Sequence, residues 1–298
     1  MIRQSLTPLS ALLALVVTIV WGTNFVVIKL ALTHLPPLTF AALRFTFVAL
    51  PAVLFFKRPR VPLWNLAAYG LLIGVGQFGV LYIAMQSLIS PGLASLVVQT
   101  QAFFTIGLFM VFGRERIKGF QVVALALAAS GLGWLMAHVN ADVTALGLGL
   151  TLFAALCWAA GNTVQRAAGP VNTVAYVVWS SLFAVPPLIG LALFVDGWPA
   201  VSAGLAHASA GTWAAVLYQS VGNSLFGYAA WAWLLSRYPA AVVSPLSLLV
   251  PVFGMATATM VLGESLASWK LTAAALVLSG LALNTLWPMW RRRRLAAA

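Results

Sequence analysis

Ten stretches of about twenty mostly apolar residues follow one another along the chain and limit what it can fold into. A helix rises about 1.5 Å per residue, so each stretch is long enough to cross the ~30 Å hydrocarbon core of a bilayer. Turn formers or charges separate the stretches, as at Pro36-Pro37 and Ser90-Pro91-Gly92. We therefore predict ten membrane-spanning helices, at residues 8–31, 38–56, 64–87, 93–112, 120–137, 145–165, 173–194, 212–235, 241–262 and 270–287.

The composition excludes a soluble protein. Hydrophobic residues make up 62% and charged residues 7% of the chain, against about 45 to 50% and about 25% in soluble domains. A transmembrane β-barrel would alternate polar and apolar residues, and this chain does not. A single cysteine, Cys157, excludes a disulfide framework or a cysteine metal cluster. We predict an all-α integral membrane protein, in contact with the lipid bilayer and without a metal.

The basic residues predict the orientation, since they stay preferentially on the cytoplasmic side. They also explain the net charge of +12 without nucleic acid as a partner. With the N-terminus inside, only Lys29 and Lys270 lie at outer span ends, while Arg44 lies within a span. The other thirteen of the 16 lie inside: Arg3, Lys57, Arg58, Arg60, Arg114, Arg116, Lys118, Arg166, Arg237 and the arginines at 291–294. We predict a bacterial-type inner membrane protein, with both termini cytoplasmic and residues 9–20 in a retained first span.

The two halves of the sequence repeat one another. Adding 149 to Trp64, Tyr69, Glu115 and Ser130-Gly131-Leu132 gives the same residue types, and Trp21 recurs as Trp158 at an offset of 137. We predict a first five-helix repeat at 1–140, a second at 141–290, and a basic tail at 291–298. The difference in offset places extra residues in an outer loop around 196–209. Because each repeat has an odd number of spans, the second repeat begins on the opposite side of the membrane and should lie inverted. This places Glu115 inside and Glu264 outside. Inverted repeats are typical of alternating-access transporters.

Several short motifs carry a family resemblance that covers nearly the whole chain. They are Trp21-Gly22-Thr23-Asn24, Leu43-Arg44-Phe45, Leu262-Gly263-Glu264 and Ser279-Gly280-Leu281. With the two five-helix halves, they resemble the EamA-type branch of the drug/metabolite transporter superfamily, and within it the exporters of aromatic amino acids. The resemblance implies a central pathway enclosed by helices one, three, four, six, eight and nine. The second half departs from the motif with Trp158-Ala159-Ala160-Gly161-Asn162.

Polar and aromatic residues near the span centres are the candidates for substrate binding. Unpaired polar groups are costly in hydrocarbon, so they should face a cavity or another helix. Amides and a hydroxyl suit a zwitterion, and aromatic faces can hold a ring or an ammonium. Each amide could equally serve interhelical hydrogen bonding, and the indoles could serve lipid packing. The candidates are Asn24, Gln77, Tyr82, Gln99, Gln101, Trp158, Asn162, Gln219, Asn223, Trp231 and Ser244.

Glycines and prolines in the same spans are candidates for gating or hinge motion. Small residues allow both close packing and bending, and we favour packing for Gly70 and Gly74. Pro245 and Pro251 should interrupt the ninth span, because proline removes a backbone donor. The hinge candidates are Gly74, Gly76, Gly79, Gly222, Pro245 and Pro251.

Arg44 lies close to the middle of the second span, where a cation costs at least ~2.5 kcal/mol. It could attract a substrate carboxylate. The structural alternative, which we favour, directs the side chain toward the outer interface, with backbone carbonyls as partners.

The residues that are absent from the spans narrow the mechanism. All four carboxylates and His34, His138 and His207 lie in predicted loops, so no proton relay is evident. No GxxxxGK[ST] loop is present, and no cofactor is expected. We predict an efflux uniporter for aromatic or hydrophobic amino acids and related small metabolites. A nucleotide-sugar or lipid-linked carrier and an integral membrane transferase are the alternatives. A monomer is favoured over a dimer, with Ala124-xxx-Ala128 and Ala275-xxx-Ser279 packing spans five and ten together.

Overall fold

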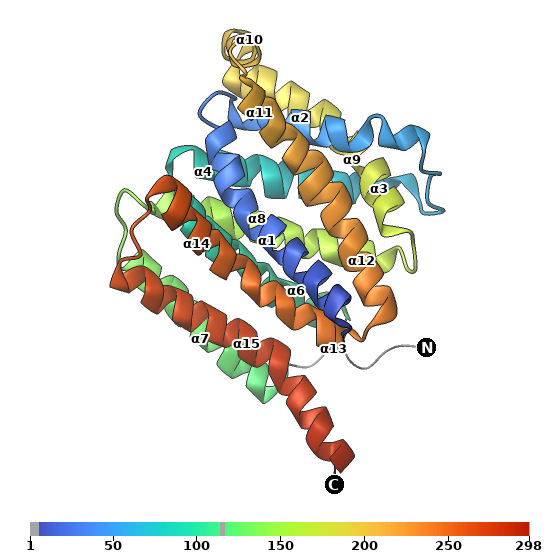
Figure 1. Ribbon diagram of the computed structural model, residues 1–298, viewed down its shortest axis with the longest axis vertical. Helices are drawn as coiled ribbons and strands as arrows, with labels where there is room; N and C mark the ends of the chain where they lie inside the picture. The colour runs from blue at the N-terminus through green and yellow to red at the C-terminus, as the bar shows by residue number, and fades with distance from the viewer. Residues whose placement is uncertain (1–5, 114–116, 298) are drawn as a thin grey trace.

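A computed structural model describes residues 6–113 and 117–297, which fold into a bundle of helices (Figure 1). The first half contains α1 (Pro8–Ala31), α2 (Pro37–Ala49) with the short η1 (Ala52–Leu54), α3 (Leu63–Gly70), η2 (Leu71–Gly79), α4 (Val80–Ser87), α5 (Pro91–Val97), η3 (Val98–Thr100), α6 (Gln101–Gly113) and α7 (Gly119–Met136). The second half contains α8 (Ala145–Ala167), α9 (Thr173–Leu191), η4 (Ala192–Asp196), α10 (Trp198–Ala206), α11 (Ala210–Leu217), η5 (Tyr218–Phe226), α12 (Gly227–Arg237), α13 (Ala240–Val243), η6 (Ser244–Leu248), α14 (Leu249–Leu262) and α15 (Ser268–Ala297). The predicted all-α membrane protein is confirmed.

Nine helices within the described residues are long and apolar enough to cross a membrane. The eighth predicted span lies in the unbroken helical run of α11, η5 and α12, which is not one of the nine. Its middle carries Gln219, Ser220, Asn223 and Ser224, which lower its apolar content. The count of ten spans stays a prediction.

Helices of the two halves pack in a reciprocal pattern. Helix α2 packs on α9, and α7 packs on α15, so these pairs join corresponding helices of the two halves. Helix α1 packs on α14, and the corresponding helices of the other half, α8 and α6, also pack together. The same pattern of neighbours is expected when two related units associate about an axis that exchanges them. It supports the predicted repeat, whose boundaries at 140 and 290 stay a prediction.

Irregular helical turns also recur at corresponding places. The third helix of each half contains a π-helical segment, η2 and η5, and the fourth contains a short 3₁₀ segment, η3 and η6. In η6 the cause is local, because Pro245 has no N–H to complete the α-helical pattern. Pro251 cannot donate to the carbonyl of Ser247, four residues before it, and that carbonyl accepts from the Gln99 amide instead. The interruption predicted at the two prolines is therefore confirmed, as the 3₁₀ segment η6.

The insertion predicted within the second half, around residues 196–209, is a helix rather than the expected loop. Helix α10 occupies residues 198–206 and lies at one end of the molecule, while α15 ends at the opposite end (Figure 1). Asp196 ends the π-helical segment η4, so its expected place in a loop is also wrong. Which end faces the cytoplasm stays a prediction.

The contact of α7 with α15 confirms that predicted spans five and ten pack together. The predicted contact residues are correct on α7 and wrong on α15. Ala124 and Ala128 are buried, as expected. Ala275 and Ser279 are exposed, so that half of the motif was wrong. The buried face of α15 is instead made by residues one or two positions away, among them Ala274, Val277, Gly280 and Leu281.

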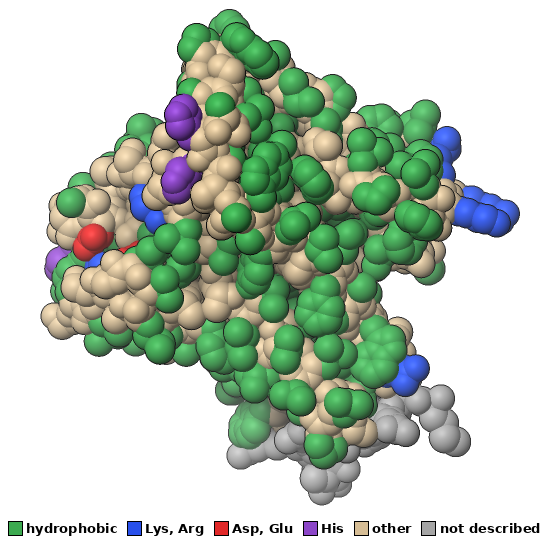
Figure 2. Space-filling model, turned by 45° about the horizontal axis from the view of Figure 1, so that its top comes forward, with side chains coloured by type: hydrophobic (Ala, Val, Ile, Leu, Met, Phe, Trp, Pro, Cys, Tyr) green, Lys and Arg blue, Asp and Glu red, His purple; other side chains and the backbone are tan. Residues whose placement is uncertain are grey.

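Charged side chains lie mostly at the margins of the molecule, and apolar side chains cover the face seen in Figure 2. Lys270 at the start of α15 is buried and forms an ion pair of 2.9 Å with Asp142. Glu264 accepts a hydrogen bond of 3.4 Å from the backbone N–H of Gly92. Glu115, the predicted partner of Glu264 in the repeat, lies outside the described residues.

Candidate functional site

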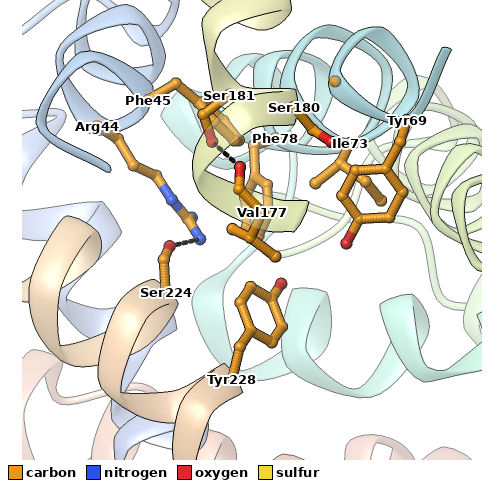
Figure 3. A pocket seen from close by; sticks show the side chains of 11 residues that line it. Arg44, Phe45, Tyr69, Ile73, Phe78, Val177, Ser180, Ser181, Ser224 and Tyr228 are labelled. Carbon is orange, nitrogen blue, oxygen red and sulfur yellow. Dashed lines mark hydrogen bonds between the residues drawn. The ribbon is translucent and has the colours of Figure 1, made fainter. Parts of the chain in front are cut away.

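Arg44 lies at the centre of a buried polar cluster that joins α2 to α4 and η5. Its Nη1 donates to the hydroxyl of Tyr82 at 2.9 Å and to Oε1 of Gln219 at 3.0 Å. Its Nη2 donates to the hydroxyl of Ser224 at 3.0 Å (Figure 3). The guanidinium carbon also lies 3.5 Å from the ring centroid of Phe78, close enough for a cation–π interaction. We call Arg44, Tyr82, Gln219 and Ser224 the Arg44 cluster.

The expected direction of the Arg44 side chain was wrong. The residue has no exposed surface, and its guanidinium binds side-chain oxygens rather than backbone carbonyls near an interface. The reason is that α2 brings Arg44 beside the polar face of η5, which supplies acceptors inside the protein. Ser220 adds a further link, since its hydroxyl donates to the carbonyl of Arg44 at 3.0 Å. The Arg44 cluster therefore fixes α2 against η5.

The Trp21-Gly22-Thr23-Asn24 motif of α1 binds the same region of the second half. The indole N–H of Trp21 donates to the carbonyl of Asn223 at 3.1 Å. The hydroxyls of Thr23 and Tyr218 lie 2.6 Å apart, and the amide of Gln219 donates to the carbonyl of Asn24 at 3.4 Å. A Cβ on Gly22 would lie 2.8 Å from the carbonyl of Val250, so glycine is required where α1 crosses α14.

A second polar group lies between α6 and α8 and is partly exposed. The Asn162 amide donates to Oε1 of Gln101 at 3.2 Å. Nearby, the Gln99 amide donates to the carbonyl of Ser247 at 3.4 Å, which ties η3 to η6. The carbonyl of Ser244 accepts from the Ser247 hydroxyl at 2.7 Å. The first contact joins α6 to α8, and the second joins the fourth helices of the two halves to each other.

The remaining candidate residues occupy three kinds of place. Asn24 and Gln77 are buried, and each leaves its amide oxygen without a hydrogen-bond partner. Trp158 is half-buried and packs on the main apolar core. Trp231 lies against Trp21, with ring centroids 5.2 Å apart. The structure thus gathers the candidates into the Arg44 cluster with α1, the group around Asn162, and isolated positions.

A small enclosed cavity adjoins Arg44 and contains residues that the sequence did not indicate. It offers about 10 Å³, close to the space of one water molecule. Its lining comes from α2, α3, η2, α9, η5 and α12 and includes Arg44, Tyr69, Phe78, Ser180, Ser224 and Tyr228 (Figure 3). Ser220 and Ser224 could have been found from the sequence as polar residues within a predicted span. Ser180 and Tyr228 also lie within predicted spans, but the sequence does not show that they lie near Arg44, because that depends on how α9 and α12 pack.

The hinge candidates differ in what surrounds them. A Cβ on Gly74 would collide with Ala184, and one on Gly76 would lie 2.7 Å from Sγ of Cys157. A Cβ on Gly79 would make an ordinary contact at 3.4 Å, with Leu188. A Cβ on Gly222 would meet only the Tyr218 ring, at 3.8 Å. Gly74 and Gly76 therefore serve close packing, whereas no contact requires glycine at 222 in this conformation.

The part of the chain that the structure describes has no group of three or more His, Cys, Asp or Glu side chains placed to hold a metal ion. The polar groups that do converge are amides, hydroxyls and one guanidinium. Such groups bind and orient a polar solute but supply no strong general base or metal-activated water at neutral pH.

Comparisons with known proteins give a consistent result. A family described as the EamA-like transporter family matches residues 8–137 and 145–286. A protein of Salmonella typhimurium named "Probable amino-acid metabolite efflux pump" is 43% identical over 91% of this chain and 93% of its own length. An Escherichia coli protein with the same name is 41% identical over 94% and 96%. A solved crystal structure with 18% identity covers 93% of this chain and 96% of its own, with a TM-score of 0.64, and shows the fold alone.

Proposed function

This chain belongs to the EamA-like transporter family, and we propose that it exports amino acids and related small metabolites across the inner membrane. One observation carries the choice of substrate: relatives that are 41 to 43% identical over nearly their full length are named as amino-acid metabolite efflux pumps. A more distant relative from Streptantibioticus cattleyicolor, 26% identical, is named "Probable terminal-alkyne amino-acid exporter". Family membership makes the chain a transporter and disfavours the transferase alternative.

The buried polar side chains suit a zwitterionic solute. The Arg44 cluster offers a cation, and the amides of Asn24, Gln77 and Asn162 offer both donors and acceptors. The indole rings of Trp21 and Trp231 lie beside η5, where Trp21 bonds the Asn223 carbonyl, and suit an apolar or aromatic side chain. These features support an amino acid better than a nucleotide sugar, whose diphosphate would call for several cations.

The mechanism we propose is alternating access between two inverted halves, with the Arg44 cluster near the membrane midplane. Corresponding helices of the halves pack in pairs, α2 on α9 and α7 on α15, as expected of two related halves that exchange inward-open and outward-open shapes. Coupling to protons is not part of the proposal, since the described carboxylates and histidines lie near helix ends. Substrate then runs down its own gradient. In the cell we expect a monomer with both termini in the cytoplasm.

Purified protein in liposomes tests the proposal. Vesicles are loaded with a labelled panel of amino acids, among them phenylalanine, leucine and cysteine, and release is followed for the wild type, Gln77→Ala and Asn162→Ala. We expect release of a subset of amino acids, no effect of an imposed pH gradient, and slower release in both variants. Absence of release for the whole panel would contradict the substrate class. Release that stops with an uncoupler would contradict uniport, and equal rates in all three proteins would remove the site assignment.

A further inference from the structure

The guanidinium of Arg44 is buried without a carboxylate beside it. Its hydrogen-bond partners, Tyr82, Gln219 and Ser224, are neutral, and its side chain has no exposed surface. Buried charges in proteins are ordinarily paired, because the desolvation of an isolated charge is costly. The Phe78 ring face compensates in part, since ring faces carry partial negative charge. The cluster thus holds a positive charge for which the described residues provide no negative partner.

The same guanidinium has donors left over. Arginine has five N–H groups, and the three hydrogen bonds to Tyr82, Gln219 and Ser224 use three of them. Nε of Arg44 is buried and has no hydrogen-bond partner at all. An arginine presents pairs of parallel N–H groups that match the two oxygens of a carboxylate. Arg44 therefore keeps both a charge and donors available for an anion.

A second unpartnered group lines the same cavity as Arg44. The hydroxyl of Ser180 on α9 has no hydrogen-bond partner although the residue is fully buried. It lines the cavity together with Tyr69 and Tyr228, and Figure 3 shows it close to Tyr69. Unsatisfied buried hydroxyls cost about 1 to 3 kcal/mol. One cavity is therefore lined by two residues that each keep an unpaired buried donor, the Nε–H of Arg44 and the hydroxyl of Ser180. Together they point to a missing acceptor.

We propose that Arg44 and Ser180 form the subsite for the carboxylate of the exported amino acid. The inference rests on the proposed function and assigns a role within it. The carboxylate would accept from Arg44 and from the Ser180 hydroxyl, with Ser224 beside them. Because the cavity has room for about one water molecule, the carboxylate can enter only after helices around it separate. The present conformation is then the empty, closed form of the subsite.

Ser180→Ala tests this assignment with little risk to folding, because it removes a group that has no partner. Ser95→Ala is the matched control. Ser95 is also fully buried, its hydroxyl bonds the carbonyl of Gly92 at 2.7 Å, and it does not line the cavity. Concentration-dependent release from liposomes gives KM and the maximal rate for the amino acid that the wild type releases fastest. Competition by the amine that lacks its carboxylate is measured alongside.

We expect Ser180→Ala to raise KM about tenfold with a smaller change in maximal rate, since it removes a hydrogen bond to a charged group. Ser95→Ala should keep the wild-type KM. In the wild type, the amine should compete about a hundredfold more weakly than the amino acid. Arg44→Lys, which keeps the charge and loses the paired donors, should also raise KM, with thermal melting reporting whether it folds.

The outcomes separate the subsite from the function. Wild-type KM in Ser180→Ala, or an amine that competes as well as the amino acid, would overturn the subsite while leaving amino acid export standing. Release that depends on chloride and not on the substrate carboxylate would assign the cavity to an inorganic anion and also overturn it. Failure of the wild type to release any amino acid would instead overturn the proposed function, and the subsite with it.

Discussion

The two π-helical segments, η2 and η5, occupy corresponding places in the two halves but are stabilised by different contacts. In η2, glycines bring the backbone against α8 and α9, where Gly74 meets Ala184 and Gly76 meets Cys157. In η5, polar side chains hold the backbone, with Gln219 and Ser224 bound to Arg44. One segment is fixed by shape and the other by hydrogen bonds.

This difference has a consequence for movement. Close glycine contacts are lost steeply when helices separate, because dispersion contacts act only at short range. A hydrogen-bonded segment can exchange its partners for those of a ligand at little net cost. We therefore expect η5 to change its contacts during transport and η2 to keep them. Substitutions in the two segments can break or sharpen this comparison.

Gln219→Leu should have the largest effect on stability. Oε1 of Gln219 accepts from both Arg44 and Tyr82, and leucine leaves both donors without this acceptor in a buried site. We expect a loss of about 3 kcal/mol, measured as the shift in thermal melting of the detergent-solubilised protein. Gln86→Leu, at an exposed position, is the control. Equal melting of the two variants would show that the Arg44 cluster does not hold η5.

Gly74→Ala should follow, at about 2 kcal/mol, because the added methyl group collides with Ala184 on α9. Gly149→Ala serves as the control, since a Cβ there meets nothing within 4 Å and alanine favours the helix. If Gly74→Ala melts at or above the wild-type temperature, η2 is not fixed by close packing.

Trp21→Phe should cost about 1 kcal/mol, the value of one hydrogen bond. The substitution removes the N–H that donates to the Asn223 carbonyl in η5 but keeps an aromatic ring against Trp231. Because η5 is the segment expected to rearrange, the transport rate per folded protein should also fall. A lower melting temperature with a wild-type transport rate per folded protein would argue that Trp21 serves only stability.

Gly222→Ala should have the smallest effect on stability, within about 1 kcal/mol, since alanine meets only the Tyr218 ring at 3.8 Å. If η5 changes shape during transport, the loss of glycine at this position should slow release from liposomes in a folded protein. A variant with wild-type melting and wild-type release would remove Gly222 from the hinge candidates.

Much of the fold could be predicted from the sequence because length and hydropathy decide which segments cross a bilayer. The first helix has the predicted bounds, 8–31, since Pro8 begins it and no breaker interrupts it. Helix α10 was missed because it is short and its position between spans suggested a loop. The π-helical segments were also missed, because hydropathy and turn formers mark where a helix begins and ends but not its hydrogen-bond pattern.

The site was predicted in part. Tyr82 and Gln219 were recognised as polar or aromatic residues near span centres, and the structure places both beside Arg44. The partners of Arg44 could not be assigned because they depend on how α2 faces η5. Ser180 was missed for the same reason, since a serine in a span more often bonds its own helix, as the neighbouring Ser181 does.

The inverted arrangement of the two halves is the central claim, and the sidedness of residues 115 and 264 tests it most directly. Glu115→Cys and Glu264→Cys are labelled in spheroplasts with a membrane-impermeant maleimide, before and after permeabilisation. The native Cys157 is buried and gives a low background. The account predicts labelling of position 264 from outside and of position 115 only after permeabilisation. Labelling of both positions from the same side would contradict it.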